Sequence, residues 1–226
     1  MFMTRLLACF LALFALAPAM AARPAKPGPA VLVIATPQGS HVVGRPGAPL
    51  KLVEYVSYTC PHCAAFEVEA ADTIALAIVR PGKGTVEYRP LLRNIIDLAA
   101  TLMAGCGAPT KFPGNHAALM RGQKKWLLPP SEAQQQRWRT GDFATRLRAV
   151  ASDMHLYPIF EGRGYGRAEL DACLANEPLA NQIAAENRKA MAELKLEGTP
   201  SFLINDVLQP GHDWASLKPA LAAATR

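Results

Sequence analysis

The amino-acid sequence predicts an α/β fold in which one sheet is interrupted by an inserted all-helical domain. Two early stretches, residues 51–58 and 85–92, are rich in β-branched and aromatic residues, and the segment between them has helical spacing of apolar residues. Helical spacing then dominates residues 95–194, and a strand-like pair returns at Val207 and Leu208. The chain of 226 residues is long enough for one domain that carries such an insertion.

The first 22 residues have the pattern of a signal peptide. Arg5 supplies a short positive region, residues 6–16 form an apolar core, and residues 19–21, Ala-Met-Ala, match a small-residue cleavage pattern. The apolar core is too short to span a bilayer. Cys9 would be removed with the peptide, and because most of the apolar core follows it, lipidation there is not expected. Export matters for the remaining cysteines, because disulfides persist outside the cytoplasm.

Residues 23–41 are expected to form a flexible leader, since their first part is rich in proline. Within this leader, residues 31–35 are either a short strand or part of the same tail. The first part of the sheet domain is expected over residues 42–94. A turn at residues 44–47, Gly-Arg-Pro-Gly, leads into its central strand, and a second strand follows the first helix.

The helical insertion is expected over residues 95–190, and the second part of the sheet domain over residues 191–226. A closing helix is predicted at residues 214–224. The spacing of apolar residues places candidate helices of the insertion at residues 95–103, 115–128, 143–154, 167–174 and 179–194.

A pair of cysteines lies where the strand at residues 51–58 passes into the following helix. Cys60 and Cys63 are three positions apart, and Pro61 would occupy the first helical turn, where its missing N–H costs nothing. Cys60 would therefore lie at the helix N-terminus, where unpaired N–H groups and the helix dipole favour an anion. Because a thiolate is such an anion, the setting predicts redox chemistry at this pair. His62, when protonated, would add a positive charge.

Residues 60–63, Cys-Pro-His-Cys, placed after a strand, resemble the active site of DsbA-like thiol–disulfide oxidoreductases of the bacterial periplasm. Far downstream, residues 198–204, Gly-Thr-Pro-Ser-Phe-Leu-Ile, resemble the cis-proline loop and the next strand of the same family. The likeness covers residues 42–224, and two motifs in the right order are more specific than either alone. It implies a thioredoxin-like sheet with an inserted all-helical domain.

The resemblance also implies roles for individual residues. Cys60 would be the attacked and leaving sulfur of a Cys60–Cys63 disulfide, and Cys63 the resolving one. Pro200 would be cis and face the disulfide, leaving the backbone of Thr199 to pair with an extended substrate segment. Glu54, in the central strand, would be the buried carboxylate that helps to move protons, and its burial should raise its pKa.

The function expected from these features is that of a periplasmic dithiol oxidase, because a stabilised thiolate stabilises the reduced form and makes the disulfide a good oxidant. Its partners would be unfolded or reduced exported proteins and a membrane disulfide reoxidase. We expect a monomer without a cofactor. The net charge of +6 does not indicate nucleic acid, because the basic residues lie on polar, helix-like stretches and the chain is expected to be exported.

Two alternatives to a dithiol oxidase stay open. A disulfide isomerase or reductase would use the same site, and Thr199 occurs in both kinds of relative. Isomerases of the family usually need a dimerisation module, and the leader is too short for one. The second alternative is a copper- or zinc-binding module that uses Cys60, Cys63 and His62. A closed zinc site needs four ligands, and the sequence shows no evident fourth.

The second pair of cysteines and the buried carboxylate each have two interpretations. Cys106 and Cys173 fall in the helical insertion, and in an exported chain a structural disulfide is favoured over two buried free thiols. Glu54 is either a proton-transfer group or the structural partner of a basic residue. The other histidines show no metal-ligand spacing; they are His41, His116, His155 and His212.

Replacing His62 tests whether its side chain tunes the reactive thiol. If His62 stabilises the Cys60 thiolate, His62→Ala should raise the Cys60 pKa and lower the reduction potential together, because one interaction sets both. About 30 mV corresponds to about 1.4 kcal/mol, or roughly one pKa unit. Thiolate absorbance against pH and equilibration with glutathione measure the two quantities. If both stay unchanged, His62 is only a turn residue.

Overall fold

The computed structural model describes residues 31–225; the expected signal peptide, residues 1–22, lies outside this range. Its centre is a sheet with the strand order β1-β2-β4-β3-β5-β6. β3 and β4 are parallel to each other, and the other neighbouring pairs are antiparallel. The strands are β1 (Leu32–Ala35), β2 (His41–Gly44), β3 (Leu50–Val56), β4 (Gly84–Pro90), β5 (Ser201–Ile204) and β6 (Val207–Leu208).

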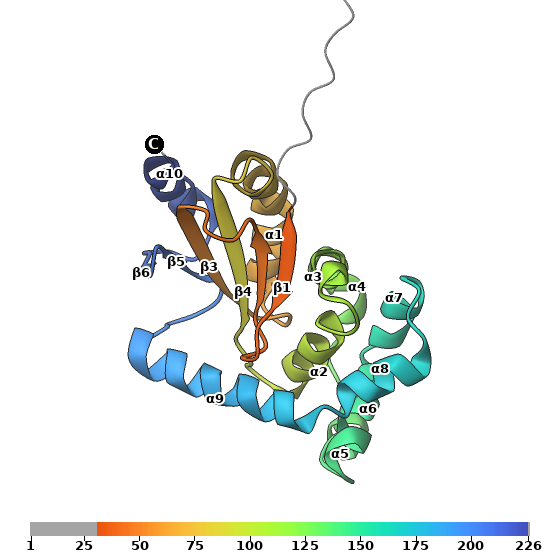
Figure 1. Cartoon of the computed structure of the whole chain (residues 1–226). Coiled ribbons are helices and arrows are strands. Elements are labelled where there is room, and N and C mark those ends of the chain that lie inside the picture. The colour runs from red at the N-terminus through yellow and green to blue at the C-terminus, as the bar shows by residue number, and fades with distance from the viewer. Residues whose placement is uncertain (1–30, 226) are drawn as a thin grey trace, which may run out of the picture.

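Helices connect the two parts of this sheet and close the chain. A strand–helix–strand unit follows β1 and β2, a long helical segment lies between β4 and β5, and one helix ends the chain (Figure 1). The helices of the first unit and the C-terminus are α1 (Pro61–Ile74), the π-helical turn η1 (Ala75–Val79) and α10 (Trp214–Ala224). Those of the helical segment are α2 (Ile95–Ala104), η2 (Pro109–Lys111), α3 (Phe112–Arg121), α4 (Gln123–Trp126), α5 (Glu132–Arg137), α6 (Phe143–Asp153), α7 (Leu156–Glu161), α8 (Arg167–Leu174) and α9 (Glu177–Leu194).

The central strand β3 is buried on both faces, which explains its nearly continuous apolar sequence. Leu50 and Leu52 share a hydrophobic cluster with α1 and α10 on one face. Val53 and Tyr55 share another with Ala190 of α9 on the opposite face. Side chains alternate along a strand, so each helix covers one set of positions. In Figure 1, α1 lies behind the sheet, and α9 runs along its lower end.

Of the two interpretations of residues 31–35, the structure shows the short strand, because residues 32–35 form β1, so the flexible leader expected at residues 23–41 does not extend over them. Leu32 pairs with Gly44 and Ala35 with His41, so β1 exists through pairing with a strand that follows it in sequence. The turn between these strands packs against α9. Gly39 has a φ of +82°, and a Cβ atom there would lie 2.3 Å from a side-chain carbon of Ile183. Only glycine satisfies both demands.

The insertion is helical, as the sequence predicts, but the number and bounds of its helices differ from the prediction. The candidate helix at residues 115–128 is divided, because α3 ends at Arg121 and α4 begins at Gln123, with Gly122 between them. Two short helices, α5 and α7, were not expected, and α9 continues past the expected boundary at residue 190. The division into domains at residues 94 and 190 stays a prediction. Among residues 31–225, no helix combines the length and the apolar character needed to cross a membrane.

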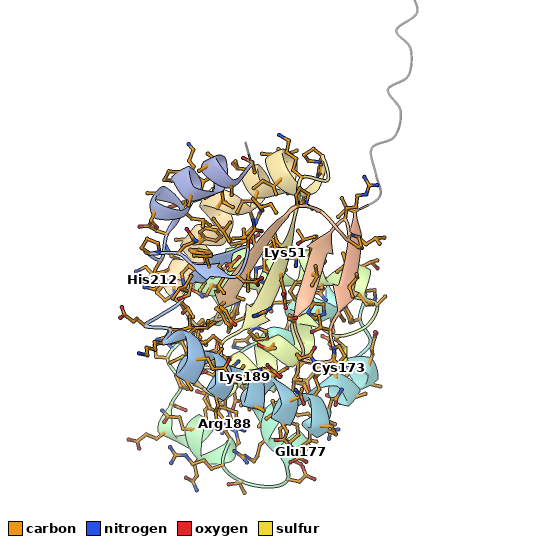
Figure 2. The ribbon with its side chains drawn as sticks, turned by 60° about the vertical axis from the view of Figure 1, so that its left-hand side comes forward. Lys51, Cys173, Glu177, Arg188, Lys189 and His212 are labelled. Carbon is orange, nitrogen blue, oxygen red and sulfur yellow. A yellow bond between two sulfur atoms is a disulfide. The ribbon has the colours of Figure 1, made fainter. Side chains whose placement is uncertain are left out.

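Cys106 and Cys173 are joined by a disulfide, with an S–S distance of 1.96 Å. Cys106 follows α2 and Cys173 lies in α8, so the bond links two helices of the insertion. Figure 2 labels Cys173 in this helical part of the molecule. Both cysteines pack against the large apolar cluster formed by the insertion. The bond therefore lies within that cluster, and its structural role is testable.

We expect the double variant Cys106→Ala/Cys173→Ala to be less stable, because the bond closes a loop of 67 residues in the unfolded chain. Chain-entropy arithmetic for such a loop gives about 4 kcal/mol as an upper value. Urea unfolding of the variant and the wild-type protein measures the difference, and thiol counting on unfolded wild-type protein checks the bond. The Cys60 pKa should not change. Equal midpoints of unfolding would contradict a stabilising role.

Candidate active site

The turn between β3 and α1 places Cys60 at the N-terminus of a helix, as the sequence predicts. Cys60 is the N-cap of α1, with an extended backbone (φ −91°, ψ 120°), and Pro61 begins the helix. The backbone N–H groups of His62 and Cys63 act on the sulfur of Cys60, which therefore lies where the first N–H groups of the helix point. Cys60 is 4 % exposed and Cys63 is fully buried, whereas Pro61 and His62 are exposed.

The pKa values of the two thiols are shifted in opposite directions. A hydrogen bond from the Cys63 thiol, aided by Thr199 and the backbone N–H groups of Cys63 and His62, lowers the pKa of Cys60 to about 4, against the effect of burial. Burial raises the pKa of Cys63 far above its ordinary value, and its hydrogen bond to Cys60 adds to this shift. At neutral pH the reduced pair is therefore a Cys60 thiolate beside a Cys63 thiol.

The buried carboxylate of Asp97 holds the turn that leads into Cys60. Asp97 lies in the first turn of α2 and is 1 % exposed. It accepts hydrogen bonds from the Ser57 hydroxyl at 2.9 Å, the Thr59 N–H at 2.8 Å and the Thr59 hydroxyl at 2.9 Å. The Arg93 N–H donates a further bond at 2.9 Å. Asp97 was not identified from the sequence; the signal was a lone charge in the otherwise apolar segment of residues 95–104.

Gln123 of α4 provides a second contact between the helical insertion and this turn. Its side-chain N–H₂ group donates to the carbonyl oxygens of Tyr58 at 2.8 Å and Cys60 at 2.9 Å. Gln123 is buried, and both of these acceptors are buried as well. A glutamine in a polar stretch gives no sequence signal of such a role, because only the tertiary structure brings it to the turn.

The loop before β5 lies against Cys60, as the two sequence motifs predict. The peptide bond between Thr199 and Pro200 is cis. The Thr199 carbonyl oxygen lies 3.1 Å from the Cys60 sulfur, across 139 positions of sequence, and accepts a hydrogen bond from Cys60 when this thiol is protonated. Antiparallel pairing of β5 with β3 produces this approach, because Tyr55 pairs with Ser201 next to the loop. The Thr199 N–H has no hydrogen-bond partner within residues 31–225.

Glu54 lies beneath the cysteine pair, on the face of β3 that α1 covers. Its side chain shares that face with Leu52 and Val56, by the alternation of the strand. It is 4 % exposed, and burial, together with the charge of Glu67, raises its pKa to about 8. No salt bridge to Glu54 occurs in the described part of the chain, so the basic partner considered from the sequence is not seen. At neutral pH Glu54 is mostly protonated.

A further acidic residue, missed in the sequence, lies one helical turn after Cys63. Glu67 is 5 % exposed, and both Glu67 and Cys63 are buried residues of α1. One carboxylate oxygen of Glu67 accepts a hydrogen bond from Arg121 at 3.1 Å, and the other lies 3.6 Å from Nε2 of His116. The Nδ1 atom of His116 lies 3.1 Å from the Tyr58 hydroxyl. The interior behind the cysteines therefore contains a connected polar network that reaches the surface at Arg121.

The remaining histidines lie apart from the cysteine pair or serve other contacts. His41 stacks on Phe112, with ring centroids 3.8 Å apart, and His155 caps α7 with a left-handed backbone. His212 contacts the carbonyl oxygen of Pro200. Over residues 31–225, no group of three or more His, Cys, Asp or Glu side chains is placed to hold a metal ion. The structure thus does not assemble His62 and the cysteine pair into such a group.

A strand, a Cys-Pro-His-Cys turn and a helix that face a cis-proline loop on a mixed sheet define the redox-active class of thioredoxin-fold proteins. A family model described as thioredoxin matches residues 36–222, and the chain belongs to this family. The solved structure of a protein-disulfide isomerase from Novosphingobium aromaticivorans is similar: its sequence is 46 % identical, and the match covers 83 % of this chain and 98 % of that one, with a TM-score of 0.79.

Two more distant relatives are consistent with this assignment. The structure of Wolbachia pipientis α-DsbA1 matches 81 % of this chain and 89 % of its own at a TM-score of 0.66, and its 17 % identity makes this a likeness of fold. A Rickettsia bellii relative, provisionally named a protein-disulfide oxidoreductase, is 24 % identical over 83 % of this chain. The chain spans 65 % of that relative's length. The resemblance to DsbA-like proteins is thereby confirmed.

Replacing Glu54 should remove a pH dependence of stability. The folded state holds the Glu54 proton up to about pH 8, whereas the ordinary pKa is 4.5, so unfolding releases a proton between these values. The contribution of Glu54 to stability should therefore fall as pH rises, by at most about 1.4 kcal/mol per pH unit. Glu54→Gln should remove this slope. Urea unfolding between pH 5 and 8 measures it.

The experiment needs the disulfide form, because the Cys60 thiolate gives the reduced protein a slope of opposite sign. The low Cys60 pKa means that the reduced protein gains stability as pH rises above about 4. Exposed Glu197→Gln is the matched control and should keep the wild-type slope. The same change of midpoint between pH 5 and pH 8 in the wild type and in Glu54→Gln would refute the burial of a protonated Glu54.

Proposed function

We propose that this protein is a protein-disulfide oxidoreductase of the DsbA type, and that it acts as a dithiol oxidase on exported proteins. The observation that carries the proposal is that the pKa of Cys60 is lowered whereas that of Cys63 is raised. A Cys60 thiolate with a pKa near 4 stabilises the reduced form, and the oxidised form has no thiolate to stabilise. The Cys60–Cys63 disulfide is then readily reduced by a substrate dithiol, which is the property of an oxidant.

The reaction begins when a substrate thiolate attacks the sulfur of Cys60. The bond between Cys60 and Cys63 breaks, and Cys63 leaves with the electron pair while a mixed disulfide forms. A second substrate thiolate then attacks the substrate sulfur of that mixed disulfide, and Cys60 leaves as a thiolate. The substrate loses two electrons and gains a disulfide, and the protein becomes a dithiol. The low pKa of Cys60 makes it the better leaving group in the second step.

Cys63 must take up a proton when it leaves, because burial makes its thiolate unfavourable. Glu54 is the proposed source. It is protonated at neutral pH, it lies on the sheet face beneath α1, and its charge acts on Cys63. Proton transfer from the Glu54 carboxyl to the Cys63 sulfur leaves a carboxylate in place of a thiolate. During reoxidation the same carboxylate accepts the proton that Cys63 must lose.

The loop at Thr199 and Pro200 is the proposed substrate-binding element. Within the described chain, the Thr199 N–H has no hydrogen-bond partner, and the Thr199 carbonyl oxygen contacts only the sulfur of Cys60. An extended substrate segment can pair with these groups while its cysteine reaches Cys60. We place the protein in the periplasm as a monomer, with a membrane disulfide reoxidase as its second partner. The N-terminal signal-peptide pattern and the DsbA-like relatives support this placement.

A disulfide isomerase is the second candidate, and one observation favours it. The Novosphingobium aromaticivorans relative, 46 % identical in sequence, is named a protein-disulfide isomerase. Isomerisation uses the same first step, but the mixed disulfide is then resolved without net oxidation. The two functions differ in the redox state in which the protein works, so the reduction potential separates them.

Equilibration of the pair with glutathione should give a potential well above the value of about −270 mV that is typical of thioredoxin. The oxidised protein should convert a reduced dithiol peptide to its disulfide in a single turnover. Cys60→Ser should abolish this reaction, and Cys63→Ser should retain a thiol that can form mixed disulfides. A potential as low as that of thioredoxin, with rearrangement of scrambled disulfides and no net oxidation, would favour the isomerase.

A further inference from the structure

The cis-proline loop is contacted by a histidine from another part of the chain. Nδ1 of His212 lies 2.7 Å from the carbonyl oxygen of Pro200. His212 belongs to the connection between β6 and α10, directly before Asp213, the N-cap of α10. Figure 2 shows His212 at the surface, on the side of the molecule that carries α10.

This contact determines which nitrogen of the imidazole ring carries a hydrogen. A carbonyl oxygen only accepts hydrogen bonds, so Nδ1 of His212 carries the hydrogen and donates it to Pro200. Asp213 holds the backbone beside the ring, because its carboxylate accepts from the Ser216 N–H at 2.9 Å and the Ser216 hydroxyl at 2.7 Å. The donor therefore belongs to a rigid helix start, and the acceptor to the loop that contacts the reactive sulfur.

The same ring lies close to the first residue of the loop. A Cβ atom on Gly198 would lie 3.8 Å from Cε1 of His212, so the ring packs over this glycine at ordinary contact distance. The Ser201 hydroxyl donates to the Gly198 carbonyl at 2.7 Å from within the loop. The carbonyl oxygens on both sides of Thr199, those of Gly198 and Pro200, thus accept hydrogen bonds. The Thr199 N–H has no hydrogen-bond partner in residues 31–225.

We propose that His212 is a positioning residue for substrate binding: its Nδ1–H holds the Pro200 carbonyl and so orients the backbone of Thr199 toward an extended substrate. This inference rests on the proposed function, since it assigns His212 to the loop that binds the substrate segment. His212 does not touch Cys60, whose own contact with the loop is through Thr199. Its contribution belongs to recognition of a polypeptide, and a small thiol that makes no backbone pairing gains nothing from it.

Two substitutions of the exposed His212 separate the effect of its hydrogen-bond donor from the effect of its side-chain size. His212→Asn keeps an N–H₂ group near the position of Nδ1, and His212→Leu removes the donor. With an extended dithiol peptide, His212→Leu should lower kcat/KM by about threefold to tenfold, the range of one lost hydrogen bond. The loss should appear in KM, because binding is affected and the sulfur chemistry is not. His212→Asn should stay within about twofold of the wild type.

Exchange with dithiothreitol is the control reaction, and all three proteins should react with it at the same rate. Nitrogen-15 spectra of the wild-type protein should show His212 as the Nδ1–H tautomer. Equal peptide kcat/KM for His212→Leu and wild type, a loss of equal size with dithiothreitol, or an Nε2–H tautomer would each overturn the proposal. A wild-type protein that oxidises neither thiol would instead overturn the proposed function, so the two failures are distinguishable.

Discussion

The buried carboxylate of Asp97 is the interaction on which the site depends most. It lies in the helical insertion, yet most of its hydrogen bonds come from the turn that connects the central strand with the redox helix. Asp97 is the acceptor shared by the Ser57 and Thr59 hydroxyls and the Thr59 N–H, and loss of an acceptor from buried polar groups is costly. Together with Gln123, it makes the position of Cys60 a property of both parts of the molecule. The insertion is therefore a support of the active site.

Burial acts in opposite ways on the two members of the cysteine pair, and this contrast explains the chemistry. Cys60, at the end of a helix, receives hydrogen bonds that outweigh the cost of burying its charge. Cys63, one turn further in, donates its hydrogen to Cys60 and has the apolar interior around it. The acidic residues beneath also respond to burial: within residues 31–225 no salt bridge reaches Glu54, and it keeps its proton. Glu67 has Arg121 within hydrogen-bond distance, although burial still raises its pKa.

The sequence was most informative where local pattern and chemistry coincide. The strand, Pro61 and the cysteine spacing define the site locally, and the motif at Thr199 predicted the approach that the pairing of β3 with β5 produces. It was least informative where a residue acts through a distant neighbour. Gln123 has no local signal, and β1 depends on pairing with β2. The short helix α5 depends on a capping box between Ser131 and Gln134, which is easily overlooked in a polar stretch.

The distance in sequence between Cys60 and Thr199 has a consequence for the order in which the molecule is built. The ribosome makes the central strand and the cysteine pair early, but β5 and its loop come 139 positions later. Until then, the edge of β3 that β5 occupies has no partner, and the thiols lack the backbone that covers them. Cys106 likewise precedes its partner by 67 positions. A growing chain thus presents Cys60, Cys63 and Cys106 before Cys173 exists, and the correct pairing is secured only when the last quarter of the chain has arrived.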